Sequence, residues 1–268
     1  MIRISDADRI RTITLDRPEA LNAFSEAMYR DAAAAFAEAA RDPEVAVVLV
    51  TGSGRAFTAG TDLVELATRV SGGMEGEGSS FPAMIDELVA FPKPLIAAVN
   101  GLALGVGATM LALCDLVFMS TEARIRCPFT ALGVAPEAGS SYTFPQLVGR
   151  QHATWALLSS EWLSADECAR AGIAWKVCEP DDLLDEARRH AEVLASKPIA
   201  SLVECKRAIT AGLREPFAAA RAREDAAFQR LLGTPANLEA LTAFAERRTP
   251  DFAAIDREHP VDLARHLG

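Results

Sequence analysis

The chain has 268 residues, 50% of them hydrophobic, and a formal net charge of −10. This length and composition indicate a globular protein that buries most of its apolar surface in one large or two small cores. The acidic net charge disfavours nucleic acid or an anionic membrane as the main partner, because both bind basic surfaces.

The five cysteines lack Cys-x-x-Cys spacing, so neither a disulfide framework nor a metal site is indicated. The N-terminus has no export pattern and no apolar run is long enough to span a bilayer, which predicts a cytoplasmic protein.

The N-terminal part of the chain predicts short strands around one helix. Ile2–Ser5 and Ile10–Leu15 are rich in β-branched residues and predict an opening hairpin. Ser25 is a suitable N-cap for an alanine-rich helix that ends near Arg41. Val45–Thr51 is a continuous apolar run of the kind that is buried on both faces of a parallel sheet.

Two apolar strands, Val45–Thr51 and Leu95–Val99, each end in a glycine-containing turn that leads into a helix, and they lie about fifty residues apart. This spacing is typical of a repeated ββα unit. If the strands are parallel, both turns lie at the carboxyl edge of the sheet, where α/β proteins bind ligands. In the second turn, Gly101, Gly105 and Gly107 allow the backbone to point N–H groups at a bound molecule. A phosphate loop is disfavoured because Met110 stands where the third glycine belongs; a purely structural glycine cluster is the other alternative.

The rest of the chain predicts a glycine-rich segment, a few more strands and then helices. Residues 71–80 contain four glycines and predict either a flap beside the site or a plain loop. The remaining predicted elements are helices at Ala83–Phe91, Ala108–Leu113, Gln151–Ser159, Ser164–Ala171, Asp181–Ala195, Pro198–Ala211, Glu215–Leu232 and Ala236–Arg248, and strands at Leu116–Ser120, Ile125–Cys127 and Lys176–Cys178. We divide the chain into a core of residues 1–198 and a helical region of residues 199–268 that serves oligomerisation or covers the site.

Three stretches together resemble the crotonase, or enoyl-CoA hydratase/isomerase, superfamily. They are RPEALNAF at residues 17–24, GRAFTAGTDL at 54–63 and KPLIAAVNGLALGVG at 93–107, extended by CDL at 114–116 and LSA at 163–165. The resemblance implies an α/β fold, a spiral of repeated ββα units with a C-terminal α-helical region. It also implies an acyl-CoA thioester as substrate, no separate cofactor because CoA is part of that substrate, and assembly as a homotrimer or a dimer of trimers.

The resemblance assigns the two turns to an oxyanion hole. One backbone N–H from each turn donates to the thioester oxygen, and the matching positions are Ala59 and Val106. Two pre-aimed N–H groups stabilise an enolate without reorganisation, and the loss of one typically costs about 3 kcal/mol of transition-state stabilisation. The usual glycine of the second position is valine here, which keeps the N–H and narrows the space around it.

The same resemblance implies the substrate contacts. The carbonyl of Ala56 is expected to hold the adenine, and Arg17 and Arg55 are either phosphate partners or ordinary solvated arginines. The other residues assigned to substrate binding flank the two donors or line the acyl group: Thr58, Gly60, Asp62, Leu63, Gly105, Phe129 and Val134.

The reaction depends on which carboxylates are present. Hydratases of this superfamily use two glutamates, and the matching positions hold Thr109 and Phe129, neither of which titrates usefully. Residues 133–145, with Cys127-Pro128-Phe129, instead resemble the Δ3,Δ2-enoyl-CoA isomerases typified by the peroxisomal enzymes, in which the glutamate matching Glu137 is the single catalytic base. One carboxylate suffices for a double-bond shift, because the same group removes the proton at C2 and returns it at C4.

Two further hypotheses compete with isomerisation by Glu137. Glu137 is also placed to cap the helix that begins near Ser140. Hydration or another crotonase reaction would then use Glu65 or a group that the sequence does not reveal. A protein that binds acyl-CoA without turnover is the third possibility, because both hydratase glutamates are missing.

Overall fold

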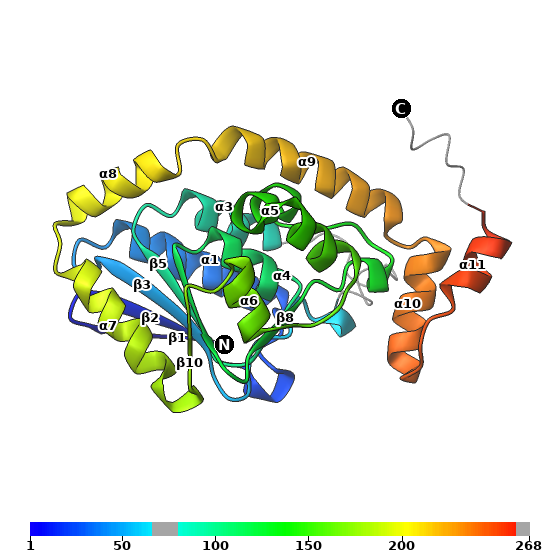
Figure 1. Ribbon diagram of the computed structural model, residues 1–268, viewed down its shortest axis with the longest axis horizontal. Coiled ribbons are helices and arrows are strands. Elements are labelled where there is room, and N and C mark those ends of the chain that lie inside the picture. Colours follow the sequence, from blue (N-terminus) through cyan, green and yellow to red (C-terminus); the bar gives the residue numbers. More distant parts are fainter. Residues whose placement is uncertain (66–79, 261–268) are drawn as a thin grey trace.

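The computed structural model describes residues 1–65 and 80–260 and shows two sheets (Figure 1). The larger sheet contains, in spatial order, β1 (Ile2–Ala7), β2 (Ile10–Leu15), β3 (Val47–Gly52), β5 (Leu95–Val99), β7 (Leu116–Ser120) and β10 (Lys176–Cys178). β1 and β2 form the predicted antiparallel hairpin, and from β2 onward neighbouring strands are parallel. The smaller sheet contains β4 (Ala56–Thr58), β6 (Leu102–Leu104), β8 (Arg124–Arg126) and β9 (Leu163–Ser164).

The two sheets are built by one repeated step. β3, β5 and β7 of the larger sheet are each followed by a short strand of the smaller one, β4, β6 and β8, and these three short strands are parallel. After β6 the chain enters α4 (Val106–Thr109), which continues as a 3-10 turn over Met110–Leu113. The predicted ββα spiral is therefore confirmed. The helix predicted over Ala108–Leu113 begins two residues earlier and tightens in its second half.

Both faces of the larger sheet are buried, as the continuous apolar run in β3 predicts. Val48 and Val50 face one hydrophobic cluster, which includes α1 (Glu26–Arg41) and α3 (Phe81–Ala90). Val47 and Leu49 face a second cluster, which includes α7 (Leu183–Ala195). The start of α1 is capped as predicted, because the Ser25 hydroxyl accepts a hydrogen bond from the Met28 N–H at 3.2 Å.

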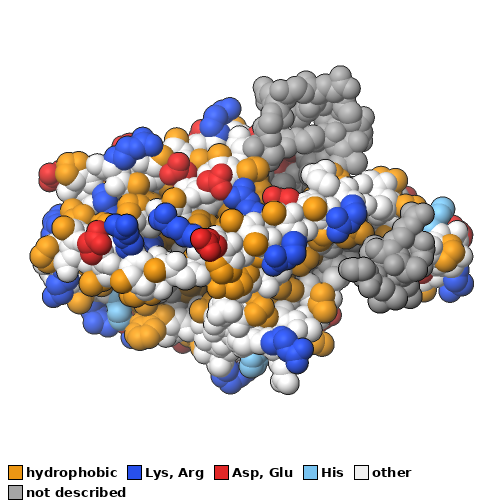
Figure 2. Space-filling view, turned by 90° about the horizontal axis from the view of Figure 1, so that it is seen from above, with side chains coloured by type: hydrophobic (Ala, Val, Ile, Leu, Met, Phe, Trp, Pro, Cys, Tyr) orange, Lys and Arg blue, Asp and Glu red, His pale blue; other side chains and the backbone are white. Residues whose placement is uncertain are grey.

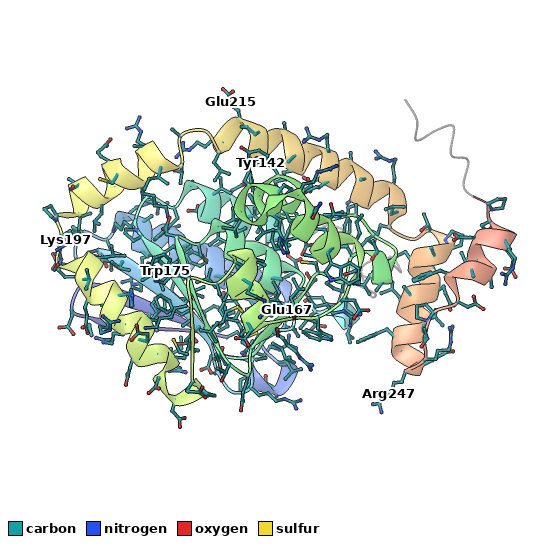
Figure 3. All side chains as sticks on the ribbon, viewed as in Figure 1. Tyr142, Glu167, Trp175, Lys197, Glu215 and Arg247 are labelled. Carbon is teal, nitrogen blue, oxygen red and sulfur yellow. The ribbon has the colours of Figure 1, made fainter. Side chains whose placement is uncertain are left out.

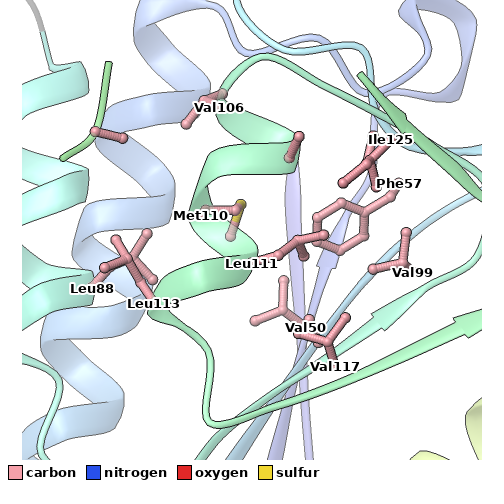
Figure 4. Packing of buried hydrophobic residues seen from close by; sticks show 14 of the residues in the cluster. Val50, Phe57, Leu88, Val99, Val106, Met110, Leu111, Leu113, Val117 and Ile125 are labelled. Atoms are coloured by element: carbon pink, nitrogen blue, oxygen red, sulfur yellow. The ribbon is translucent and has the colours of Figure 1, made fainter. Parts of the chain in front are cut away.

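The second turn is anchored in the first of these clusters. Leu111 of the 3-10 turn lies beside Phe57 and Val50, whereas Val106 and Met110 lie on the opposite side of the helix (Figure 4). All five belong to this cluster. Because the whole first turn of this short helix is buried, its N-terminus is held rigidly at the edge of the sheet.

The C-terminal half is helical, as predicted. It contains α5 (Ser140–Leu158), α6 (Ala165–Ala171), α8 (Ile199–Ile209), α9 (Arg214–Leu231), α10 (Pro235–Glu246) and α11 (Phe252–Glu258). α8 and α9 run one after the other along the top of the molecule, and α10 and α11 lie beyond α9 at the right of the view (Figure 1). Seen from above, lysine and arginine side chains are scattered among hydrophobic ones rather than gathered in one patch (Figure 2).

Two helices of the C-terminal half differ from the prediction. α5 begins at Ser140, where a helix start is expected, and continues across a kink at Gly149, where φ is 73° and ψ is 161°, into the helix predicted over Gln151–Ser159. α11 was not predicted. Residues 71–79 of the glycine-rich segment lie outside the described residues.

No helix within residues 1–65 and 80–260 is long and apolar enough to cross a membrane. The same residues contain no group of three or more histidine, cysteine, aspartate or glutamate side chains arranged to hold a metal ion.

Candidate active site

The two glycine turns that follow β4 and β6 touch each other. Gly60 and Gly105 both have positive φ angles, of 83° and 52°, which glycine adopts without strain. A Cβ atom on Gly60 would lie 2.8 Å from the Leu104 carbonyl oxygen, and one on Gly105 would lie 4.0 Å from the Gly60 Cα. The backbones of the two turns therefore meet where no side chain separates them.

A cavity of about 270 Å³ opens at this meeting point. Its walls come from both turns, from the segment that leads to α5, and from α9, α10 and the residues after α10. The lining residues include Gly60, Thr61, Leu63, Gly105, Phe129, Val134, Glu137, Phe228, Asn237 and Phe244. A second cavity, of about 840 Å³, shares Ala59, Thr61, Leu63, Leu104 and Phe244 with the first. The two cavities adjoin at the turns, so a long ligand can lie in the second and place one end in the first.

The first turn does not offer the predicted N–H. The Ala59 N–H already donates to the Leu21 carbonyl at 2.9 Å, so the prediction of Ala59 as a donor is contradicted. Phe24 donates to the Gly60 carbonyl at 2.7 Å and accepts from the Asp62 N–H at 2.9 Å. In such a parallel bridge the residue between them, Thr61, turns its own N–H to the opposite side. Thr61 lines the cavity, and its N–H donates to no described residue.

The N–H group of Val106, the predicted donor of the second turn, lies at the start of a helix. Val106 is the first residue of α4 and follows Gly105, the N-cap. The first N–H groups of a helix have no partner within the helix, and the Val106 N–H finds no acceptor among the described residues. Gly107 must be glycine, because a Cβ atom there would clash with the Thr58 side chain.

Glu137 lies beside both turns. Its Oε1 atom is 3.7 Å from the position that a Cβ atom on Gly105 would take. Burial raises the pKa of Glu137 to about 8, and the negative charges of Glu224 and Asp225 act in the same direction. Among the described residues that line the first cavity, Glu137 is the only carboxylate.

Glu137 does not cap α5, the competing role considered from the sequence. The N-cap of α5 is Gly139, which has no side chain that could supply a capping hydrogen bond. The N–H groups of Gly139 and Ser141 instead donate to the two carboxylate oxygens of Glu224, each at 2.7 Å. The Glu137 carboxyl is thus left to face the cavity.

The two positions that hold the hydratase glutamates contribute no acid or base. Thr109 is fully buried, and its Oγ1 lies 3.4 Å from the Val106 carbonyl oxygen. Phe129 lines the first cavity with its ring. Glu65 lines the second cavity only, and its carboxylate accepts a hydrogen bond from the Glu26 N–H at 3.1 Å, at the N-terminus of α1.

The other predicted binding residues are placed in two groups. Gly60, Leu63, Gly105, Phe129 and Val134 line the first cavity. Arg17, Asp62 and Leu63 line the second.

Two of these residues are already engaged with each other. Arg17 is paired with Asp62 at 2.8 Å, and Asp62 also accepts hydrogen bonds from the Val64 and Glu65 N–H groups. Asp62 therefore ties Arg17 to the start of the helix that follows the first turn.

Three predicted binding residues line neither cavity. Arg55 is exposed. The Ala56 carbonyl, the expected adenine partner, already accepts hydrogen bonds from the side-chain amides of Asn22 at 2.8 Å and Asn100 at 3.2 Å. Thr58 is fully buried and donates to the Asn22 carbonyl at 2.7 Å, so it shapes the first turn from within.

The structure also brings residues to the site that sequence reasoning missed. Phe228 and Phe244 line the cavity from α9 and α10, and Glu224 of α9 caps α5. Tyr29 of α1 is buried, and its hydroxyl lies 2.7 Å from the Thr61 hydroxyl. Phe228, Phe244 and Glu224 lie in helices whose patterns resemble an ordinary surface layer, so no local signal distinguishes them.

A spiral of ββα units that presents two glycine turns and one desolvated carboxylate to an apolar cavity defines an enzyme of the crotonase type. Comparison with known proteins agrees, since the family model described as enoyl-CoA hydratase/isomerase matches residues 6–255. The chain therefore belongs to the enoyl-CoA hydratase/isomerase family.

Three similar proteins illustrate the range of the family. The 1,2-epoxyphenylacetyl-CoA isomerase of Escherichia coli K12 is 33% identical over 91% of this chain and 94% of its own length. The crystal structure of the enoyl-CoA hydratase EchA8_6 from Mycobacterium marinum is 57% identical, with a TM-score of 0.74 over 78% of this chain and 98% of that one. An enoyl-CoA hydratase/isomerase structure from Pseudoalteromonas atlantica T6c is 35% identical, with a TM-score of 0.88 over 94% and 99% of the two chains.

Proposed function

We propose that this protein is a Δ3,Δ2-enoyl-CoA isomerase. The observation that carries the proposal is Glu137, the one carboxylate among the described residues of the first cavity, which stands beside both turns on a mostly apolar wall. Double-bond migration needs one group that takes and returns a proton, whereas hydration in this superfamily uses two glutamates. The places of those two glutamates hold Thr109 and Phe129.

The geometry supports the following steps. The N–H groups of Thr61 and Val106 donate to the thioester oxygen of a 3-enoyl-CoA. The Glu137 carboxylate takes the proton from C2, and the C–H electron pair delocalises into an enolate that the two donors stabilise. C4 then takes the proton back from Glu137, the double bond settles between C2 and C3, and the carboxylate is regenerated.

The environment of Glu137 suits this shuttle. A carboxyl with a pKa near 8 binds the proton taken from C2 firmly enough to carry it to C4. Phe129, Phe228 and Val134 line the cavity and keep water from the enolate. Because the base must start ionised, turnover is expected to rise as the pH increases through about 8.

The test is turnover of a 3-enoyl-CoA, followed by the appearance of the conjugated 2-enoyl thioester. Replacement Glu137→Gln is expected to lower kcat by about 100- to 10,000-fold, the usual contribution of a general acid–base. The same replacement at the exposed Glu161 serves as the control and is expected to leave turnover near the wild-type value. Full turnover in Glu137→Gln would overturn the proposal.

Hydration is the second candidate, because similar proteins carry hydratase names. Its marker is loss of the 2-enoyl absorbance when the protein is added to crotonyl-CoA, and Glu65→Gln would then abolish activity if Glu65 were the base. Tight binding of CoA esters without turnover across chain lengths and double-bond positions would favour the third hypothesis, an acyl-CoA-binding protein.

We also propose a homotrimer or a dimer of trimers, located in the cytoplasm and acting in fatty acid metabolism. α9 and α10 of the region 199–268 wall the cavity, which supports a covering role for that region. Light scattering after size exclusion is expected to give three or six times the chain mass of 28.6 kDa. A monomer would contradict the proposed assembly.

A further inference from the structure

The turn that carries Glu137 is held in an unfavourable backbone conformation. Ala138 and Gly139, which follow it directly, have φ angles of 58° and 69°. A left-handed conformation costs a residue with a Cβ about 1–2 kcal/mol, and Ala138 is not glycine. Such a turn persists only where surrounding contacts impose it.

The contacts that impose this conformation come from α9. Glu224 is only 4% exposed, and its carboxylate accepts the N–H groups of Gly139 and Ser141 at 2.7 Å each. The Phe217 ring lies so close to Gly139 that a Cβ atom there would clash with it. Tyr142, at the start of α5, lies directly beneath α9 (Figure 3), in agreement with the contacts between these two helices.

We propose that Glu224 is the positioning residue of the catalytic base. Its carboxylate holds the turn at residues 137–141 so that the Glu137 carboxyl stands at the two donor turns. Its negative charge also repels the negative charge of the ionised Glu137. This inference rests on the proposed function of Glu137. Glu224 touches no substrate in this arrangement and acts through Glu137.

The charged and titratable groups around Glu137 come from several elements. They are Glu224 and Asp225 of α9, Tyr29 of α1, Cys127 after β8, and Arg126 and Arg248 on the cavity wall. Tyr29 and Cys127 are neutral at physiological pH, because burial raises both pKa values, that of Cys127 to about 12. Arg248 is paired with Glu239.

Glu224 is the strongest of the negative neighbours. Asp225 has a side chain that is 61% exposed, so solvent screens its charge. Burial raises the pKa of Glu224, but hydrogen bonds from Ser141 and Gly139 favour its ionised form. After burial itself, Glu224 is the largest cause of the raised pKa of Glu137.

Replacement Glu224→Gln tests the charge. Removing it is expected to move the acid limb of the kcat–pH profile to lower pH by about half a unit or more, with KM for the CoA ester unchanged within about twofold. Asp225→Asn is the matched control, since it removes the same charge from the neighbouring exposed residue and is expected to shift the limb far less. An unshifted limb in Glu224→Gln, or an equal shift in both variants, would overturn the role of the charge.

Replacement Glu224→Asp tests the clamp. It keeps the charge but shortens the reach to Gly139 and Ser141, so kcat is expected to fall at least about tenfold through misplacement of the base while the acid limb stays near its wild-type pH. Unchanged kcat in this variant would refute the positioning role. Glu224→Asp also serves as the second variant if Glu224→Gln does not fold.

A readout independent of turnover separates this inference from the proposed function. In 13C-carboxyl NMR titrations, the resonance that is missing from Glu137→Gln identifies the Glu137 carboxyl. The titration midpoint of this carboxyl is expected at lower pH in Glu224→Gln than in the wild type. A wild-type protein without isomerase activity would refute the proposed function alone. An unchanged Glu137 midpoint in Glu224→Gln would refute the action of Glu224 on Glu137.

Discussion

The spiral core and the C-terminal helices contribute to the site in different ways. The core contributes backbone, since glycines and strand pairing orient the N–H groups of Thr61 and Val106. The C-terminal helices contribute side chains: Phe228 and Asn237 wall the cavity and Glu224 clamps the base. Under the proposed function, the core stabilises the intermediate, and the helices hold the base and limit which acyl groups fit.

The largest expected effect removes one backbone donor from the core. Val106 is the first residue of α4, where proline is tolerated because the missing N–H has no helical partner. Val106→Pro is expected to lower kcat by about 100- to 1,000-fold, the usual cost of losing one oxyanion donor.

Val106→Ala is the matched control, since it shortens the side chain and keeps the N–H. Steady-state rates with a 3-enoyl-CoA, together with circular dichroism to check folding, measure the difference. Equal rates in the two folded variants would show that the second turn does not stabilise the oxyanion.

A smaller effect is expected when a side chain of the C-terminal helices is removed. Asn237 of α10 is 2% exposed; its amide donates to the Leu132 carbonyl at 2.8 Å and accepts from the Gly233 N–H at 2.9 Å. Asn237→Ala leaves both partners unsatisfied and is expected to lower the free energy of unfolding by about 2 kcal/mol.

The neighbouring Leu238 is 48% exposed, so Leu238→Ala is a control that is expected to change stability by about 0.5 kcal/mol or less. Urea denaturation measures both variants. If Asn237→Ala were no less stable than Leu238→Ala, the attachment of α10 to the cavity wall would not depend on this amide.

A further effect concerns the stability cost of ionising Glu137. The pKa of Glu137 is about 8 in the folded protein, against an ordinary value of 4.5, so the folded state binds the proton more tightly than the unfolded chain. The stabilisation from this group is complete below about pH 4.5 and is lost as the pH rises through about 8.

The expected loss is about 1 kcal/mol per pH unit within this window. Glu137→Gln lacks this contribution, so its free energy of unfolding, measured in urea at several pH values between 5 and 8, is expected to fall less steeply than that of the wild type. Parallel pH profiles for the two proteins would contradict the raised pKa.

Sequence patterns predict the features of the core that depend on residues close together in the chain. The strands, the glycine turns and the position of Val106 follow from residues close together in the chain, and each was predicted. The sequence places the donor of the first turn at Ala59, whose N–H is engaged, because the direction of each N–H depends on pairing with Leu21 and Phe24. Those partners lie far outside the turn in the sequence.

By itself the sequence determined the ββα spiral, the two turns, and the absence of titratable groups at positions 109 and 129. Only the tertiary structure decided which N–H groups are free, that Glu137 faces the cavity, and that Glu224 caps α5 in its place. The reason is physical: hydrophobic period and glycine position act over a few residues, whereas the hydrogen bond from Gly139 to Glu224 joins residues 85 apart. The desolvation that sets the pKa of Glu137 likewise exists only once the chain has packed around it.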